Sequence, residues 1–106
     1  MNWIVGALAA AVLYEIIKEW GWKRGYRRTD EAIDEVPETP GVYVLHFPGL
    51  NAVYVGSSKQ LRTRLKQHQR TKPGWSTFDW KTTATEREAR NLERRLQRTV
   101  KRRSGK

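Results

Sequence analysis

The chain has 106 residues, of which 21 are lysine or arginine and 11 are aspartate or glutamate, so its formal net charge at pH 7 is +10. This length provides for one small domain with a modest core. The absence of cysteine and the presence of only two histidines exclude disulfides, thiolate chemistry and a histidine-rich metal site. A metal would have to be held by carboxylates and water, which suits Mg²⁺. The positive charge favours a polyanionic partner, either nucleic acid or an acidic membrane surface.

The first predicted element is an apolar helix over residues 1–22. Its uncharged run from Trp3 to Tyr14 is followed by two further tryptophans and then by a cluster of cations. Aromatic residues at both ends and cations at one end are typical of a membrane anchor with the rest of the chain in the cytoplasm. However, the uncharged run is shorter than the ~20 residues of a spanning helix. Two interpretations stay open: residues 3–22 anchor a cytoplasmic protein to the inner face of a membrane, or they form a helix buried in a core or an oligomer interface.

A charged linker is predicted next, at residues 23–36. Its sequence turns from basic to acidic and is followed by prolines at positions 37 and 40. This composition allows at most one short helical turn, at residues 31–35. The functional domain is therefore expected to occupy residues 37–106.

A β-hairpin is predicted at the start of that domain. Residues 41–47 (GVYVLHF) and 52–56 (AVYVG) have the apolar alternation of strands, and the turn sequence PGLN separates them. Gly56 is expected to end the second strand. Tyr43 and Tyr54 are the hairpin residues best suited to chemistry.

A cationic helix is predicted to follow the hairpin. Ser57 or Ser58 is expected to cap it, because a serine side chain can accept a hydrogen bond from a free backbone N–H. Helical spacing places four residues on one face of this helix: Leu61, Arg64, Leu65 and His68. This face would bring a guanidinium and an imidazole over the two tyrosines.

A short strand at residues 78–83 and a final helix from Thr85 complete the predicted elements. The helix begins with the capping-box sequence TERE. An apolar stripe marks its buried side: Ala89, Leu92, Leu96 and Val100. Glu93 falls at the margin of that stripe. Because burial of an unpaired carboxylate is unfavourable, Glu93 is predicted to pair with a buried arginine or to bind a metal, unless it reaches water at the helix edge.

These segments together resemble the GIY-YIG nuclease family. The two halves of the family motif appear as Gly41-Val42-Tyr43 and Tyr54-Val55-Gly56. The family's arginine, ten positions after the second tyrosine, matches Arg64, and a histidine four positions later matches His68. The glutamate of the family's last helix matches Glu93. The resemblance extends over residues 37–100.

The resemblance implies an α/β domain of the α+β type, in which helices flank a three-stranded antiparallel sheet. It implies an endonuclease that hydrolyses phosphodiester bonds in DNA with Mg²⁺ or Mn²⁺ and without a small-molecule cofactor. Glu93 would hold the metal, which neutralises the leaving oxygen, and Arg64 would meet the charge on the phosphate. His68 with Tyr43 or Tyr54 would assist the nucleophilic water.

Two features of the family are not found in this sequence: an asparagine that many members carry after the glutamate helix, and a separate DNA-binding module. Cations would replace the module by contacting phosphates without reading bases, which predicts low sequence specificity and a steep dependence on salt. These cations belong to the two predicted helices and their flanks: Lys59, Arg62, Lys66, Arg70, Arg94 and Arg98. Two other functions stay open, a catalytically silent nucleic-acid-binding module and a membrane-associated interaction protein that meets anionic lipid.

Overall fold

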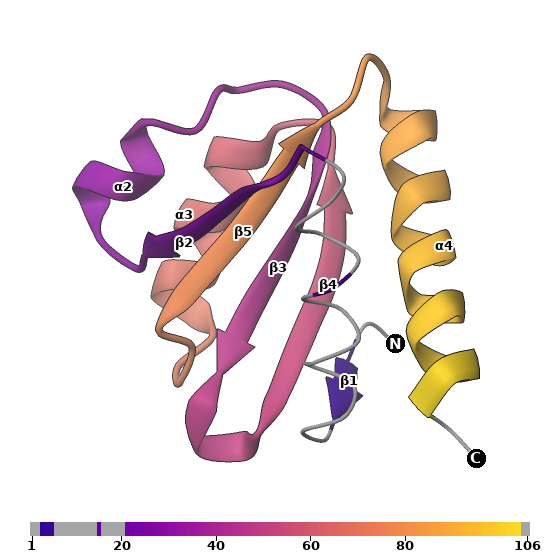
Figure 1. Ribbon diagram of the computed structural model, residues 1–106. Coiled ribbons are helices and arrows are strands. Elements are labelled where there is room, and N and C mark those ends of the chain that lie inside the picture. The colour runs from indigo at the N-terminus through magenta and orange to yellow at the C-terminus, as the bar shows by residue number, and fades with distance from the viewer. Residues whose placement is uncertain (1–2, 6–14, 16–20, 105–106) are drawn as a thin grey trace.

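The computed structural model describes residues 3–5, 15 and 21–104. Its framework is an antiparallel sheet of five strands in the order β1-β4-β3-β5-β2 (Figure 1). The strands are β1 (Trp3–Val5), β2 (Lys23–Arg27), β3 (Gly41–Phe47), β4 (Ala52–Ser58) and β5 (Thr77–Thr82). The helices are α2 (Asp30–Asp34), the short 3₁₀ turn η1 (Pro48–Leu50), α3 (Leu61–Thr71) and α4 (Glu86–Ser104).

The expected fold class is confirmed, but the sheet has five strands instead of three. The predicted strands form its centre, β4-β3-β5, and the two additional strands lie at its edges. The centre was predictable because its strands are largely buried and therefore rich in apolar residues, which is a signal that the sequence shows directly. The edges lack that signal.

Edge strand β1 corrects the prediction for the N-terminus. Trp3–Val5 pairs with Ala52–Tyr54 of β4, so a helix over residues 1–22 is wrong at these three residues. Most of the candidate membrane anchor, at residues 6–14 and 16–20, lies outside the described residues. In the part of the chain that the structure describes, no helix is long and apolar enough to cross a membrane.

Edge strand β2 lies in the segment that was predicted to be a linker. Its residues are mostly exposed, so it lacks the apolar alternation that identifies a strand. Its register on β5 shifts between Lys23 and Tyr26, where Gly25 has a φ of +73°. Asp79 of β5 accepts a hydrogen bond from the Gly25 N–H (2.8 Å) and bonds His46 of β3 (2.5 Å). Side chains of the central strands thus hold β2 in place.

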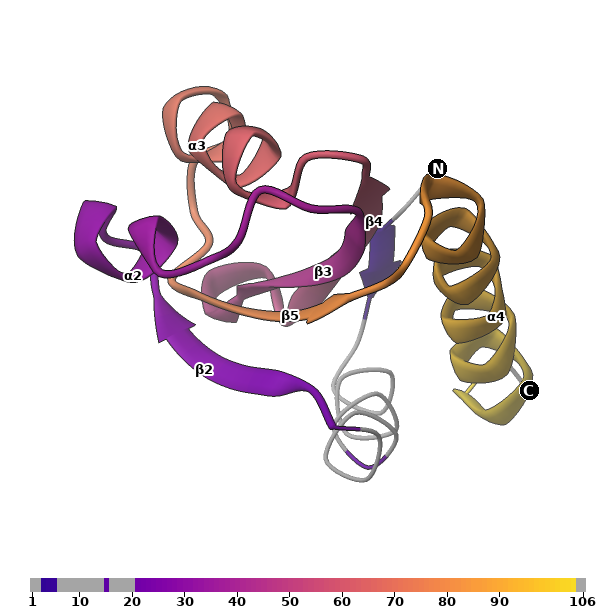
Figure 2. The same ribbon diagram turned by 90° about the horizontal axis from the view of Figure 1, so that it is seen from above.

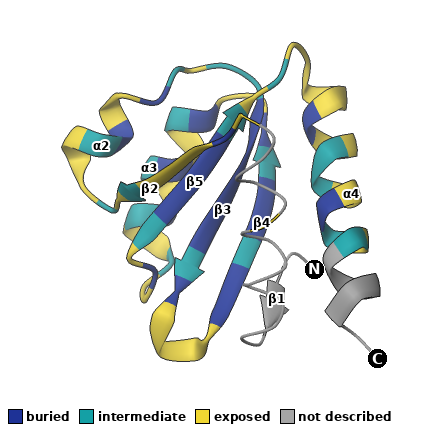
Figure 3. Cartoon of the chain, in the orientation of Figure 1, coloured by how far each residue is buried: buried dark blue, intermediate teal, exposed yellow. Residues whose placement is uncertain are grey.

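The sheet separates two apolar clusters, and β3 contributes alternate side chains to both. On one side α2 and α3 cover the sheet, and this cluster includes Ile33, Tyr43, Leu45, Phe47, Leu61 and Leu65. On the other side lies α4, and that cluster includes Val42, Val44, Val53, Val55, Ala89 and Leu96. Figure 2 shows α2 and α3 together and α4 apart from them, and Figure 3 shows the buried strands between exposed helix surfaces. The side chain of each sheet residue therefore belongs to either the α3 face or the α4 face.

Helix α3 begins later than expected. Strand β4 continues past Gly56 to Ser58, and the N-cap residue of α3 is Gln60, without a capping serine. The carboxylate of Glu38 serves this end of the helix instead. It accepts hydrogen bonds from the backbone N–H of Thr63 (3.0 Å) and from the Thr63 hydroxyl, and its negative charge complements the helix dipole.

Helix α4 begins with the predicted capping box. Thr85 Oγ1 accepts a hydrogen bond from the backbone N–H of Glu88 (3.1 Å), and the Glu88 carboxylate accepts one from the N–H of Ala84 (3.0 Å). Its apolar stripe faces the sheet, with Ala89 and Leu96 buried. This packing fixes the rotation of α4 and directs Glu93 toward the end of β4.

Candidate active site

Two tyrosines and a histidine form a cluster on the α3 face of the sheet. Tyr43 of β3 is almost fully buried, and its Oη lies 2.7 Å from Nε2 of His68 in α3. The half-buried Tyr54 of β4 is a diagonal cross-strand neighbour of Tyr43, with the ring centres 6.3 Å apart and the planes nearly parallel. The ring of His68 lies edge-on to Tyr54, 5.4 Å away. We refer to Tyr43, Tyr54 and His68 as the tyrosine–histidine cluster.

Gly56 makes the position of Tyr43 possible. It lies within β4, directly opposite Tyr43. A Cβ atom at Gly56 would lie 2.5 Å from the Tyr43 Oη and 2.6 Å from its Cζ, closer than real Cβ atoms approach other atoms. The sequence analysis expected Gly56 to end the strand, but β4 continues to Ser58. Gly56 instead leaves space for the phenol ring of Tyr43 to cross the strand.

Both hydrogen-bonded partners of the cluster are uncharged at neutral pH. Burial, assisted by the nearby Tyr54, raises the pKa of Tyr43, and Arg64 opposes this shift in part. Burial also lowers the pKa of His68 to about 4, assisted by the positive charges of Lys72 and Arg64. The Tyr43 hydroxyl can therefore donate its hydrogen to a neutral His68 Nε2.

The buried neutral histidine predicts a pH dependence of folding stability. The pKa of His68 is about 4 in the folded chain against 6.5 for an ordinary histidine, so the unfolded chain binds more protons between these values. The stability contributed by neutral His68 is complete above pH 6.5 and is lost as the pH falls through about 4. In urea titrations, the unfolding free energy of the wild type minus that of His68→Gln should decrease from pH 7 to pH 4. A constant difference would contradict the assignment.

The side chain of Arg64 in α3 is exposed, whereas Leu61, Leu65 and His68 point into the core. The four residues were predicted to share one face of the helix; the side chain of Arg64 is exposed at that face and still interacts with the buried Tyr43. Arg64 lines a cavity of about 150 Å³ together with Ser57 at the end of β4 and other residues of α3 and α4. Its charge still reaches the cluster, since it acts on the pKa of both Tyr43 and His68.

Glu93 reaches the same end of β4 from the α4 face. Its Oε1 accepts a hydrogen bond from Ser57 Oγ (2.5 Å), and its Oε2 accepts one from Gln97 Nε2 (3.1 Å). One alternative left open for this carboxylate was pairing with a buried arginine. The two hydrogen bonds instead join it to a serine and a glutamine. The sequence singled out Ser57 only as a possible helix cap and did not single out Gln97, because their role at Glu93 depends on which face of the strand and helix they occupy.

The end of β4 brings the two groups together. Strand β1 pairs only with residues 52–54, so within the described residues the stretch from Val55 to Ser58 has β3 as its one strand neighbour. The tyrosine–histidine cluster and Arg64 lie on one side of this end, and Glu93 lies on the other. Ser57 connects them, because it lines the cavity with Arg64 and bonds Glu93.

The fit of a divalent cation at Glu93 can be tested on the ligands present. Among the described residues, no group of three or more His, Cys, Asp or Glu side chains could hold a metal. A single carboxylate is nevertheless sufficient for Mg²⁺, which keeps several waters and is completed by substrate phosphates. Ser57 and Gln97 each occupy one position on a carboxylate oxygen that can accept twice, so Glu93 retains capacity for a cation.

Another cation lies near the cluster. Nζ of Lys72, which follows α3, is 4.4 Å from the centre of the Tyr54 ring, within the range of a cation–π contact. The sequence did not single out Lys72, because it lies beyond the helix that carries Arg64. It contributes positive charge beside the tyrosine that is more accessible to solvent.

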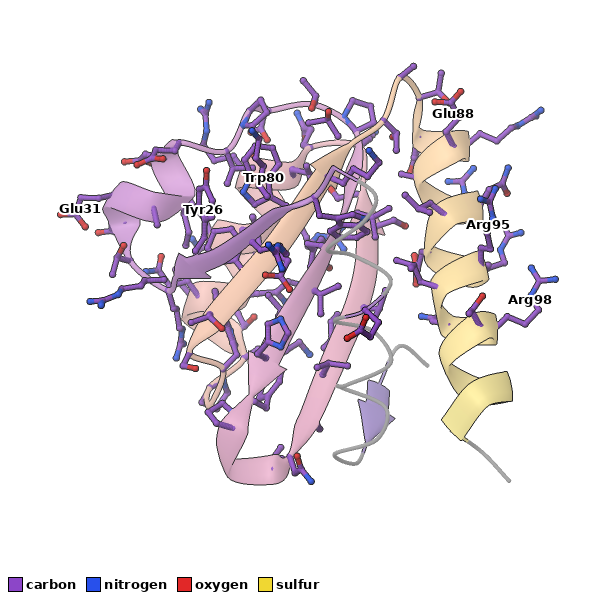
Figure 4. The ribbon with its side chains drawn as sticks, viewed as in Figure 1. Tyr26, Glu31, Trp80, Glu88, Arg95 and Arg98 are labelled. Atoms are coloured by element: carbon purple, nitrogen blue, oxygen red, sulfur yellow. The ribbon has the colours of Figure 1, made fainter. Side chains whose placement is uncertain are left out.

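The cations predicted to bind nucleic acid differ in their availability. Arg62 donates from Nε to the backbone carbonyl of Val36 (2.8 Å), and Lys66 forms an ion pair with Asp34 (2.9 Å), so both hold α2 and its flank against α3. The others have exposed side chains: Lys59, Arg70, Arg94 and Arg98. Figure 4 shows Arg98 and its neighbour Arg95 projecting from α4 away from the sheet. The α4 arginines are therefore available to an outside partner, as are Lys59 and Arg70.

Residues 39–106 match the family model of the GIY-YIG catalytic domain, and the chain therefore belongs to this family of nuclease domains. It is similar to UvrABC system protein C of Methanosphaera stadtmanae, with 36% identity over 75 residues, covering 59% of this chain and 12% of that protein. It is also similar to UvrABC system protein C of Beutenbergia cavernae, with 39% identity over 70 residues, covering 56% of this chain and 10% of that protein. The chain thus spans about a tenth of the length of these curated relatives. No solved structure matches it.

Proposed function

We propose that this domain is a metal-dependent endonuclease that hydrolyses phosphodiester bonds in DNA with low sequence specificity. The observation that carries the proposal is the convergence at the end of β4, where a neutral Tyr–His pair, an exposed arginine and an oriented carboxylate meet. Phosphodiester hydrolysis needs a proton acceptor for water and positive charge around the phosphate. Membership of a nuclease family supports this reaction class.

The tyrosine–histidine cluster would assist the attacking water. Tyr54 is the half-buried member and the one that a water at the strand edge can reach, while Tyr43 is enclosed behind it. Because the pKa of Tyr43 is raised, its hydroxyl acts as a hydrogen-bond donor and keeps the ring of His68 in place. The one acceptor nitrogen of neutral His68 is occupied by the Tyr43 hydroxyl, so His68 would assist by fixing the cluster, and Tyr54 would be the member that meets the water.

Arg64 and Glu93 would act on the phosphate from opposite sides of the strand edge. The guanidinium of Arg64 offers planar, paired donors to phosphate oxygens, which gain charge during hydrolysis. Glu93 would hold Mg²⁺ or Mn²⁺, and a bound divalent ion supplies Lewis-acid stabilisation of the leaving oxygen. Ser57 and Gln97 keep the carboxylate aimed at this edge.

The DNA-binding surface is proposed to run along α4. Arg94 and Arg98 are exposed on the side of the helix opposite its buried stripe. Glu86, at the start of the same helix, lines the cavity that contains Arg64. A nucleic-acid backbone bound in the cavity can therefore continue along the arginines of α4. Contacts of this kind go to phosphates and do not read bases, so they support low sequence specificity.

The α4 surface predicts a specific change in salt dependence. The double variant Arg94→Ala/Arg98→Ala should weaken DNA binding to a similar extent for unrelated sequences. The slope of log affinity against log salt should become shallower by about two, one for each lost phosphate contact. A matched control, Lys23→Ala/Arg27→Ala, removes two exposed cations from the edge strand β2. Equal slopes for the two double variants would remove α4 from the binding surface.

The proposed reaction is tested by nicking of supercoiled plasmid at low salt. The wild type should nick the plasmid with Mg²⁺ and not with EDTA, and Glu93→Ala should lose this activity while it still binds DNA. Circular dichroism verifies that the variant is folded. A wild type that binds DNA tightly without nicking it in Mg²⁺ or Mn²⁺ would indicate instead the catalytically silent nucleic-acid-binding module. The observation that favours this second function is that, among the described residues, no group of three or more His, Cys, Asp or Glu side chains could hold a metal.

A further inference from the structure

We propose that Ser57 and Gln97 are positioning residues that hold the Glu93 carboxylate in the orientation needed to bind a hydrated divalent cation. This inference rests on the proposed function, since it assigns roles to two residues around the carboxylate. It goes beyond that function, because a metal bound by Glu93 does not by itself assign a role to either residue.

The two residues bond different oxygens of the carboxylate. Ser57 Oγ donates to Oε1 (2.5 Å), and Gln97 Nε2 donates to Oε2 (3.1 Å). Two donors on two oxygens fix both the position and the plane of the carboxylate, whereas one donor would leave it free to rotate. Each carboxylate oxygen can accept a second interaction, so the bonds orient Glu93 without saturating it.

Gln97 also connects α4 with the strand that carries the active-site edge. It lies one helical turn after Glu93 on the same side of α4. Its Nε2 reaches the backbone carbonyl of Val55 (3.4 Å) as well as the carboxylate. Ser57 lies two residues beyond Val55 in β4. Two contacts with β4 therefore position the carboxylate: one through Ser57 and one through Gln97 and the Val55 carbonyl. The carboxylate itself belongs to helix α4.

Orientation matters here because the proposed metal position has one carboxylate. A glutamate side chain has three rotatable bonds, and ordering it lowers its conformational entropy. Where several ligands surround a metal they restrain one another, but within the described residues Glu93 belongs to no group of three or more acidic, histidine or cysteine side chains. Hydrogen bonds from neighbouring groups then determine the ligand geometry, and their loss typically costs about 10- to 100-fold in metal affinity or activity.

The experiment measures Mn²⁺ binding to the intact chain by calorimetry, without DNA. Gln97→Met keeps the size of the side chain and removes its donor, and Ser57→Ala removes the hydroxyl. Each variant should bind Mn²⁺ about 10-fold more weakly than the wild type. Ser57→Thr keeps the hydroxyl and should bind nearly normally. Asn91→Met removes an exposed amide from the same helix and serves as the matched control.

A second readout separates positioning from folding. The Mg²⁺ concentration for half-maximal plasmid nicking should rise in Gln97→Met and Ser57→Ala by the same factor as the Mn²⁺ dissociation constant, and high Mg²⁺ should restore the rate. Loss of the fold would not be restored by metal.

The outcomes distinguish this inference from the function on which it rests. If Glu93→Gln weakens Mn²⁺ binding while Gln97→Met and Ser57→Ala bind it as the wild type does, the positioning role is overturned and the metal site stands. If Glu93→Gln itself binds Mn²⁺ like the wild type, the metal does not belong at Glu93, and both proposals fail.

Discussion

Replacing Arg64 by alanine is expected to slow DNA nicking by about 100- to 1,000-fold, the cost of losing one donor group that stabilises a charged transition state. The guanidinium lines the cavity at the end of β4, and its charge acts on Tyr43 and His68. Its side chain is exposed, so its removal should change the free energy of unfolding by no more than about 0.5 kcal/mol. Plasmid nicking under single-turnover conditions, together with urea denaturation, measures both effects.

Two further substitutions sharpen the test of Arg64. Arg64→Lys keeps the positive charge but loses the planar fork of donors, so its rate should lie between those of the wild type and Arg64→Ala. Arg27→Ala removes an exposed arginine from β2, at the far edge of the sheet, and should nick at the wild-type rate. A rate for Arg64→Ala within a few-fold of that of Arg27→Ala would exclude a role for Arg64 in the reaction.

Gly56→Ala is expected to lower both stability and activity. The new Cβ would lie 2.5 Å from the Tyr43 Oη and 2.6 Å from Cζ, so the phenol ring has to move. Because that ring is buried in the core, overpacking of this kind should cost about 1–3 kcal/mol of unfolding free energy. Movement of Tyr43 also breaks its hydrogen bond to His68, which is the pair proposed to assist the attacking water.

Gly49→Ala is the matched control for this substitution. Gly49 lies in η1, and a Cβ there would meet nothing within 4 Å. We expect this variant to differ from the wild type by no more than about 0.5 kcal/mol in urea denaturation. NMR of the His68 ring should show a changed environment in Gly56→Ala and an unchanged one in Gly49→Ala. Equal stability of the two variants would mean that Tyr43 does not need the space above Gly56.

The central part of the fold could be predicted from the sequence because its signals are local. Buried strands β3 and β4 alternate in a way that fixes the hairpin, and the pairing register then makes Tyr43 and Tyr54 diagonal neighbours. The capping box of α4 and its apolar stripe fix the helix start and the direction of Glu93. These short-range patterns were enough to bring the candidate residues to one end of the sheet.

The edges of the sheet and the contacts of the site could not be predicted in the same way. Strand β2 is exposed, and Asp79 from a distant part of the chain helps to hold it, so its own residues carry little signal. In the sequence, Arg62 and Lys66 were as good candidates for DNA binding as the other cations. In the structure, Arg62 bonds the Val36 carbonyl and Lys66 pairs with Asp34. Ser57 acquires importance only because β4 extends further than its apolar residues indicated.

The central claim is that Arg64 and Glu93 act on one phosphate although they approach the edge of β4 from opposite faces of the sheet. The most direct test is anomalous diffraction from crystals of the chain bound to a cleavage-resistant phosphorothioate oligonucleotide and Mn²⁺. We predict an anomalous Mn²⁺ peak at the Glu93 carboxylate, with a backbone phosphate between this ion and the Arg64 guanidinium. A Mn²⁺ ion away from Glu93, or DNA that lies along α4 with no phosphate at the β4 edge, would contradict the account.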